Sequence, residues 1–308
     1  MFIPQRNLMR LIVISCVFSL FVLSGCRPTA QATEDVKEQM IEQWKQDFKQ
    51  LKSMKLSAKV YKISTDGKEK HLFVEGSFVY DAPMFLDDII LAGKQNANSK
   101  RAYDGKYFYA YTSGKAFAHL RPADHPQSAL IRAMKADLSR PVNTLNPLYD
   151  IFEFALPDGD NTFSALSKPE TWDNLKNRIV GFKSNPDGSY LFRYRRKLQP
   201  DGSQPGYAVT VVSKNGVFVP ASINETQPPQ DVINVIKVVE YSAVDKSAFP
   251  LPIPLKLSVQ PITNGVSHGQ TETVIDKKSL QVNSSIDKRI FTLHPKNPTE
   301  LIDVKILE

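Results

Sequence analysis

Residues 54–80 of this 308-residue chain read MKLSAKVYKISTDGKEKHLFVEGSFVY and establish a two-residue period. Apolar residues occupy every second position from Leu56 to Val60, and nearly every second position from Leu72 to Tyr80. This period is typical of strands that bury one face, and Asp66-Gly67 between the two runs is typical of a tight turn. The stretch therefore predicts an antiparallel hairpin.

Strand signals recur on the C-terminal side of this hairpin. Segment 107–111, YFYAY, is apolar or aromatic throughout, which predicts a strand that is covered, or lines a cavity, on both faces. The pattern indicates roughly ten or more strands in one sheet, and an open sheet that large tends to curl. The sequence thus predicts a mainly β (α+β) fold, with one large, curved antiparallel sheet and helices against one face. The further strands are expected at 85–92, 106–111, 116–120, from about 179 onward, 208–213, 217–221, 232–241, 255–260, 271–275, 279–282 and 290–293.

One amphipathic helix is expected before the hairpin, at residues 34–52, with Thr33 as its cap. Its polar face mixes both signs of charge, whereas helices that lie in a membrane surface favour Lys and Arg there. We therefore favour a helix laid on the core over a membrane-surface helix. Its apolar stripe consists of Val36, Met40, Ile41, Trp44, Phe48 and Leu51.

A helical insertion is expected to interrupt the sheet at about residues 122–180. One helix follows Pro126, and the pair Asn146-Pro147 is typical of the start of a second. A third short helix follows Pro169.

The N-terminus has the layout of an export signal. Arg6 and Arg10 precede an uncharged run from residue 11 to 23, which is too short to span a bilayer as a helix. Leu23-Ser24-Gly25-Cys26 resembles a bacterial lipoprotein box. This resemblance implies cleavage before Cys26, a diacylglyceryl group on its sulfur, and an acyl chain such as palmitate on its new amino terminus. The alternative is an ordinary signal peptide with a chance cysteine.

Three segments follow from this interpretation: a cleaved signal at 1–25, a lipidated tether at 26–33, and a single domain at 34–308. Removing residues 1–25 leaves 283 residues and lowers the formal charge from +7 to +5. Cys16 leaves with the signal and Cys26 is acylated, so no disulfide or thiolate site is expected. We expect a lipid-anchored, periplasm-facing protein of the cell envelope. Arg27, rather than Asp, after the cysteine favours the outer membrane over the inner one.

A family resemblance is carried by Gly76-Ser77-Phe78, by Pro83 seven residues after the glycine, and by YDGKYFYAY at 103–111. This arrangement resembles the lipoprotein-sorting superfamily of periplasmic lipoprotein carriers and outer-membrane lipoprotein receptors. The resemblance covers residues 36–120, is weaker over 205–303 and is absent across 122–180. It implies an incomplete barrel with helices packed in its concave face and a hydrophobic cavity that shelters acyl chains. No residue of this chain matches the arginine that gates the family's cavity.

Residues that could carry catalysis or bind a metal are scattered. The run Asp158-Gly159-Asp160 lacks the glycine and glutamate positions of a calcium loop. Asp87 and Asp88 are adjacent on an expected strand and would face opposite sides of the sheet. The sequence therefore predicts no enzyme, no metal site and no cofactor. The histidines also lack metal-site spacing; they are His71, His119, His125, His268 and His294.

Basic and aromatic residues alternate between residues 190 and 197. Arg193, Arg195 and Lys197 would share one face of a strand, and the aromatic residues would share the other. Nucleic acid is not expected at an exported, anchored protein, so anionic lipid headgroups and plain solvent are the two alternatives for the basic face. The aromatic residues are Tyr190, Phe192 and Tyr194.

The sequence as a whole predicts a membrane-anchored lipoprotein that binds lipid or lipoprotein acyl chains in a hydrophobic cavity, as a receptor or carrier. The alternative is a structural or regulatory interaction module of the envelope, with a filled core and no ligand. Lipid that co-purifies with the native protein would distinguish the two. The residues expected to line the cavity are Trp44, Phe48, Phe78, Tyr107, Tyr109 and Tyr111.

Overall fold

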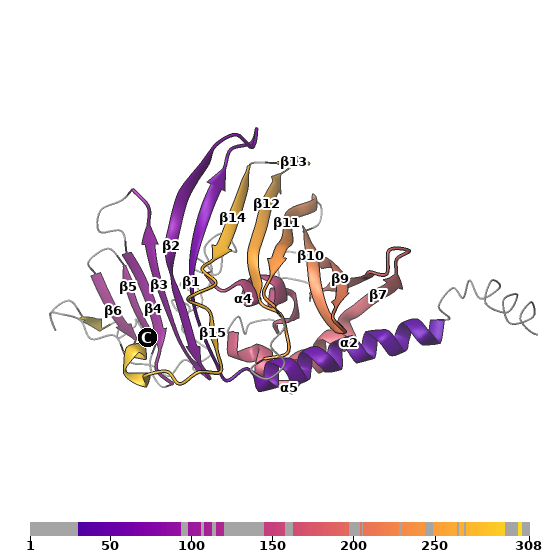
Figure 1. Cartoon of the computed structure of the whole chain (residues 1–308), viewed down its shortest axis with the longest axis horizontal. Coiled ribbons are helices and arrows are strands. Elements are labelled where there is room, and N and C mark those ends of the chain that lie inside the picture. Colours follow the sequence, from indigo (N-terminus) through magenta and orange to yellow (C-terminus); the bar gives the residue numbers. More distant parts are fainter. Residues whose placement is uncertain are drawn as a thin grey trace, which may run out of the picture.

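Figure 1 shows one large curved sheet with helices gathered on its concave side. This arrangement confirms the predicted mainly β fold with an incomplete barrel. In this computed structural model, the described residues are 30–93, 98–105, 108–112, 115–119, 145–157, 163–196, 204, 206–227, 230–243, 249–263, 265–267, 269–292 and 301–303.

Sixteen strands within these residues form the sheet, in the order β16-β6-β5-β4-β3-β2-β1-β14-β12-β11-β10-β9-β8-β7, with β13 and β15 as short additions. Neighbours pair antiparallel except β16 and β6, which pair parallel. Because β16 and β7 are the two ends of this order, the sheet does not close. The strands are β1 Ser53–Ile63, β2 Lys70–Asp81, β3 Met84–Leu91, β4 Asn98–Tyr103, β5 Phe108–Thr112, β6 Lys115–His119, β7 Ile179–Ser184, β8 Tyr190–Arg195, β9 Gly206–Lys214, β10 Val217–Gln227, β11 Gln230–Tyr241, β12 Pro254–Thr263, β13 Val266–Ser267, β14 Gln270–Ile275, β15 Gln281–Val282 and β16 Leu301–Asp303.

The hairpin predicted from residues 54–80 is formed by β1 and β2. Leu56 pairs with Phe78 and Val60 pairs with Val74, and all four side chains are buried. Gly67 in the turn has a φ of 71°, a conformation that glycine adopts without steric cost.

β1 also joins the two ends of the chain. Its other edge pairs with β14, so that Ala58 lies opposite Ile275 and Val60 lies opposite Thr273. The N-terminal strands β1–β6 and the later strands β7–β12 therefore form two halves of one sheet, and β14 lies between them.

The helices are α2 (Ala30–Gln50), α4 (Pro147–Phe152) and α5 (Pro169–Arg178), with short 3-10 helices η2 (Glu153–Ala155), η3 (Phe163–Ser167) and η4 (Lys288–Phe291). The predicted start of a helix at Asn146-Pro147 is confirmed, because the Asn146 side chain accepts hydrogen bonds from the Leu148 and Tyr149 amides. α2 begins four residues before its predicted start, so Thr33 lies inside the helix and does not cap it. The alanines at 30 and 32 favour this extension.

The predicted strands differ from the structure at two places. Residues 288–291 form η4 instead of part of a strand, because Asp287 accepts a hydrogen bond from the Arg289 amide and so starts a helical turn. β4 was not predicted, since its sequence NSKRAY lacks apolar alternation; it forms between β3 and β5. The helix expected after Pro126 lies outside the described residues.

The C-terminal segment covers part of the convex face. Phe291, at the end of η4, is fully buried against Val79 and Met84, which form a second small cluster together with Leu86 and Ile286. Val79 is adjacent to Phe78 and Tyr80, which belong to the main core. The sheet is therefore covered on both faces at β2 and β3.

Candidate functional site

An aromatic cluster fills the concave face where α2 crosses the sheet. Trp44 and Phe48 keep 0 and 1% of their surface exposed. The Trp44 ring lies 5.3 Å from Phe152 and 6.0 Å from Trp172, and the Phe48 ring stacks on Trp172 at 5.4 Å. This part of the concave face is therefore a packed core contributed by α2, α4 and α5.

Two side chains of α2 are tied to the backbone of β10. The Trp44 indole donates to the Phe218 carbonyl oxygen at 2.8 Å, and the Phe218 amide donates to Gln43 Oε1 at 2.8 Å. The indole N–H is thus satisfied although it is buried, as such groups require. No pattern in the sequence pointed to Gln43, because a glutamine on a helix usually faces solvent.

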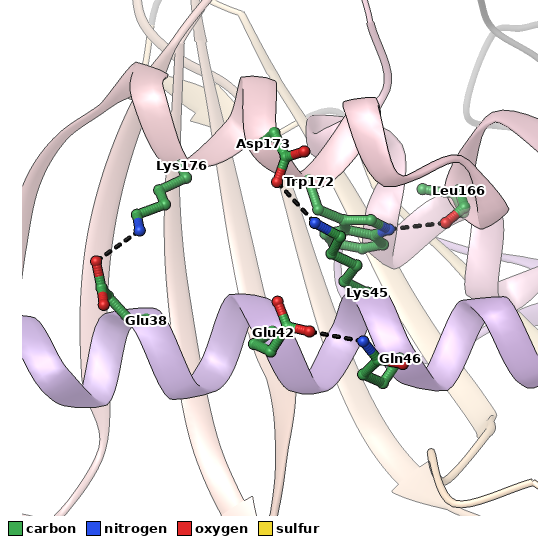
Figure 2. Close-up of polar contacts among 8 residues, drawn as sticks. All are labelled: Glu38, Glu42, Lys45, Gln46, Leu166, Trp172, Asp173 and Lys176. Atoms are coloured by element: carbon green, nitrogen blue, oxygen red, sulfur yellow. Dashed lines mark hydrogen bonds and ion pairs between the residues drawn. The ribbon is translucent and has the colours of Figure 1, made fainter.

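Figure 2 shows how α5 is held against α2. Lys45 pairs with Asp173 at 2.9 Å and Lys176 pairs with Glu38 at 2.5 Å, both at the exposed rim. Beneath them, the Trp172 indole donates to the Leu166 carbonyl oxygen at 2.8 Å. Packing in the centre and ion pairs at the rim hold the two helices together.

Three of the six expected cavity residues lie in the main buried cluster, namely Trp44, Phe48 and Phe78. Tyr107 lies outside the described residues. In β5, Tyr109 pairs with Ala102 and Tyr111 pairs with Lys100; the side chains of both tyrosines lie outside the described part.

The half of the concave face formed by β2–β4 has a different composition. Phe78 pairs with Asp87 and Asp87 with Arg101, and this row continues in β5 to Ala110. Asp87 and Arg101 form an ion pair of 2.9 Å whose side chains are only 13 and 12% exposed. Burial raises the pKa of Asp87, and the Arg101 guanidinium opposes this rise.

Half-buried hydrophobic side chains lie on the same face of the sheet as this ion pair. Phe85 lies across from Tyr103, with the ring centres 6.4 Å apart, and Phe85 and Leu91 pack on the edge of the main cluster. Gly76 lies in the same face, and Leu145 packs over it. Asp88 instead pairs with Lys100 at 2.6 Å. The two aspartates therefore have separate partners, as expected from their adjacent positions.

A second polar group lies under the later strands. Glu153 in η2 is 3.9 Å from Arg196, whose guanidinium lies 5.4 Å from the ring centre of Tyr207. Burial raises the pKa of Glu153 to about 7, the Arg196 charge lowers it, and the Glu225 charge raises it further. The sequence did not point to this group, because its members are far apart in the chain.

Neither polar group has the composition of a metal site. Among the residues that the structure describes, no three His, Cys, Asp or Glu side chains are placed to hold a metal ion. No helix among the described residues is long and apolar enough to cross a membrane.

Grooves occur on the surface, and the rings of the aromatic cluster do not line them. One of about 750 Å³ lies between the first turns of α2 and strand β7, and another of about 590 Å³ lies between α2 and α5. A third, of about 360 Å³, lies over β1, β2 and β14. The first of these is next to the start of α2.

The strand with alternating basic and aromatic residues is β8. Arg193 and Arg195 are exposed, whereas Phe192 and Tyr194 are buried and Tyr190 is half-buried in the core. The predicted separation of the two faces is thus confirmed for these residues. Lys197 lies outside the described part of the chain.

No family model and no curated protein matches the sequence. The solved structures that are similar to the chain include the following three. A DUF1329 family protein from Desulfovibrio piger is 8% identical, with a TM-score of 0.46, and the match covers 83% of this chain and 96% of that one. A LolA superfamily protein from Nitrosomonas europaea is 8% identical, with a TM-score of 0.45 and coverages of 83 and 97%.

The third is a protein domain from Vibrio parahaemolyticus described as outer membrane lipoprotein-sorting; it is 7% identical, with a TM-score of 0.43 and coverages of 82 and 96%.

Proposed function

We propose that this protein is a lipid-anchored receptor or carrier of the cell envelope that binds a lipid or lipoprotein acyl chain. The observation that carries the proposal is the β2–β4 part of the concave face. There, Phe85, Leu91 and Tyr103 remain half-buried at the rim of the core of an unclosed sheet. Apolar side chains at the open side of a curved sheet are suited to a flexible hydrocarbon chain.

The packing of the other half supports this location. The space under β7–β12 is occupied by Trp44, Phe48 and Trp172, which have almost no exposed surface. An acyl chain would have to displace these rings in order to bind there. We therefore assign the ligand to the β2–β4 side, with the aromatic cluster as its supporting wall.

The mechanism is burial. Each methylene group removed from water stabilises the complex by about 0.8 kcal/mol, so affinity should rise with chain length. The Asp87–Arg101 ion pair lies beside Phe85 and Tyr103 and offers a polar contact for the carboxyl or ester end of a chain. No bond needs to be made or broken.

The anchor belongs to the same proposal. Cys26 lies outside the described residues, so its lipidation, and retention at the outer membrane, rest on the sequence. An anchored protein does not diffuse freely, and receiving or sensing a ligand at the membrane therefore suits this chain better than ferrying it.

Fatty-acid titration of the mature chain, residues 26–308 with Cys26→Ala, tests the proposal. Fluorescence with a labelled palmitate should show saturable binding, which Phe85→Ser weakens at least tenfold. Val239→Ser is the matched control, because Val239 is 58% exposed on β11. Thermal unfolding of each variant separates lost binding from lost folding. Absence of saturable binding in a folded wild-type chain would refute the proposal.

The second candidate function is an interaction module of the envelope without a ligand. The packed cluster around Trp44 favours it, because that part of the concave face is filled by the protein's own side chains. Native mass spectrometry of the purified protein distinguishes the two functions. Co-purified lipid supports the receptor, and a ligand-free mass together with no palmitate binding supports the module.

A further inference from the structure

Three basic residues share the convex face at one end of the sheet. Lys183 is on β7, and Arg193 and Arg195 are on β8; all three are exposed. Gly181 pairs with Arg193, so the alternation along both strands places the three residues on one face. We call Lys183, Arg193 and Arg195 the basic edge.

Within the described part of the chain, no neighbour neutralises the charges of the basic edge. None of the three forms an ion pair with another described residue. Asp187, in the turn that follows β7, is instead held by hydrogen bonds from the amide and hydroxyl of Ser189. Three cations on one face therefore favour an anionic partner.

The position of α2 indicates which anionic partner this is. Thr33, Glu34 and Lys37 line one groove together with β7, so the start of α2 lies beside the basic edge. Cys26 precedes Ala30 by four residues, which span at most about 14 Å. A lipidated Cys26 would hold this end of the sheet at the bilayer surface. Val180 on β7, 60% exposed, lies at the same end.

We propose that the basic edge contacts anionic lipid headgroups and orients the domain on its membrane. The β7–β8 end then faces the bilayer, and the β2–β4 part of the concave face lies towards the other end of the strand order. The proposal rests on the lipid anchor of the proposed function. It does not depend on whether an acyl chain binds at β2–β4.

The expected contribution to membrane partitioning is modest for each basic residue and substantial for the three together. A Lys or Arg close to an anionic leaflet strengthens partitioning about fivefold, and the effect falls off within a Debye length, about 10 Å at 0.1 M salt. Three residues on one face should therefore strengthen partitioning by more than tenfold. The short reach from Cys26 keeps the start of α2, and β7 beside it, close to the leaflet.

Vesicle co-sedimentation of the mature chain with Cys26→Ala tests the proposal without the anchor. The vesicles are phosphatidylcholine, with or without phosphatidylglycerol. The test variant is Lys183→Ala/Arg193→Ala/Arg195→Ala. The matched control is Lys55→Ala/Lys278→Ala/Lys288→Ala, which removes the same charge from exposed positions on β1 and in the C-terminal segment.

The proposal predicts that the protein binds only the vesicles that contain phosphatidylglycerol. It also predicts that this binding falls more than tenfold in the test variant and less than twofold in the control. Equal losses in both variants would show that net charge alone acts, and would overturn it. So would equal binding to both kinds of vesicle. Each variant's palmitate titration is an independent readout, so failure here leaves the acyl-chain proposal standing, and the reverse also holds.

Discussion

At the scale of single residues, Gly76 occupies a position in β2 where no side chain fits. A Cβ at Gly76 would lie 2.7 Å from Cδ1 of Leu145 and closer still to the Asp88 carbonyl oxygen. Gly76→Ala should therefore lower the free energy of unfolding by about 1–3 kcal/mol, as overpacking does. Urea denaturation measures this. Gly181→Ala, at a position where a Cβ meets nothing within 4 Å, should change it by less than about 0.5 kcal/mol.

We expect Asp47 to make the stability of the protein depend on pH. It is buried on α2, accepts a hydrogen bond from Gln43, and its pKa is raised from 3.8 to about 6 by burial. Because the folded state then binds the proton more tightly than the unfolded state, protonated Asp47 stabilises the fold at low pH. This stabilisation falls as the pH rises from about 4 to 6 and is lost above that.

Asp47→Asn removes this dependence and can still accept the hydrogen bond from Gln43. It should raise the free energy of unfolding at pH 7.5 by about 1–3 kcal/mol and leave the free energy of unfolding at pH 4 nearly unchanged. Thermal and urea unfolding at both pH values measure this. Glu42→Gln, exposed on the same helix, is the control, and a similar gain there would contradict the assignment to Asp47.

Residue roles were predictable from the sequence only where they follow from local pattern. The cap at Asn146 and the outward Arg193 fall in this class. The partners of Asp87 and Glu153 do not, because Arg101 and Arg196 reach them through strand order and chain folding. Pairings between distant segments leave no periodic signal.

At the scale of elements, α5 is held to α2 chiefly by packing. Trp172 is fully buried against Trp44 and Phe48. Trp172→Ala should therefore lower the free energy of unfolding by about 3–5 kcal/mol. Lys176→Ala removes only an exposed ion pair with Glu38 and should cost less than about 1 kcal/mol. Guanidinium titration of both variants compares the two contributions, and similar losses would contradict the ranking.

Elements were predicted well where composition and period agree. The β1–β2 hairpin, the hairpin of β9 and β10, and the helices after Asn146 and Pro169 are confirmed. β4 was missed because a polar strand between two others shows no alternation. The strand predicted at 290–293 is wrong for residues 290–291. Phe291 is buried, but it belongs to a helical turn and not to a strand.

At the scale of the whole molecule, the anchor is the strongest prediction that remains to be tested. Expression with an alkyne analogue of palmitate in a bacterial host should label the wild-type chain. Cys26→Ser should abolish the label. Cys16→Ser is the matched control and should retain full labelling, because that residue leaves with the signal. Labelling of the Cys26→Ser protein would exclude the lipoprotein assignment.

The pairing of β1 with β14 affects how the chain can fold. β1 is among the first strands to be synthesised, and its partner β14 is among the last, so one edge of the N-terminal hairpin stays open until nearly all residues have emerged. Contacts between such distant segments slow folding, and an open strand edge can pair with other chains. Newly made protein should therefore depend on a holding chaperone until its C-terminal strands arrive.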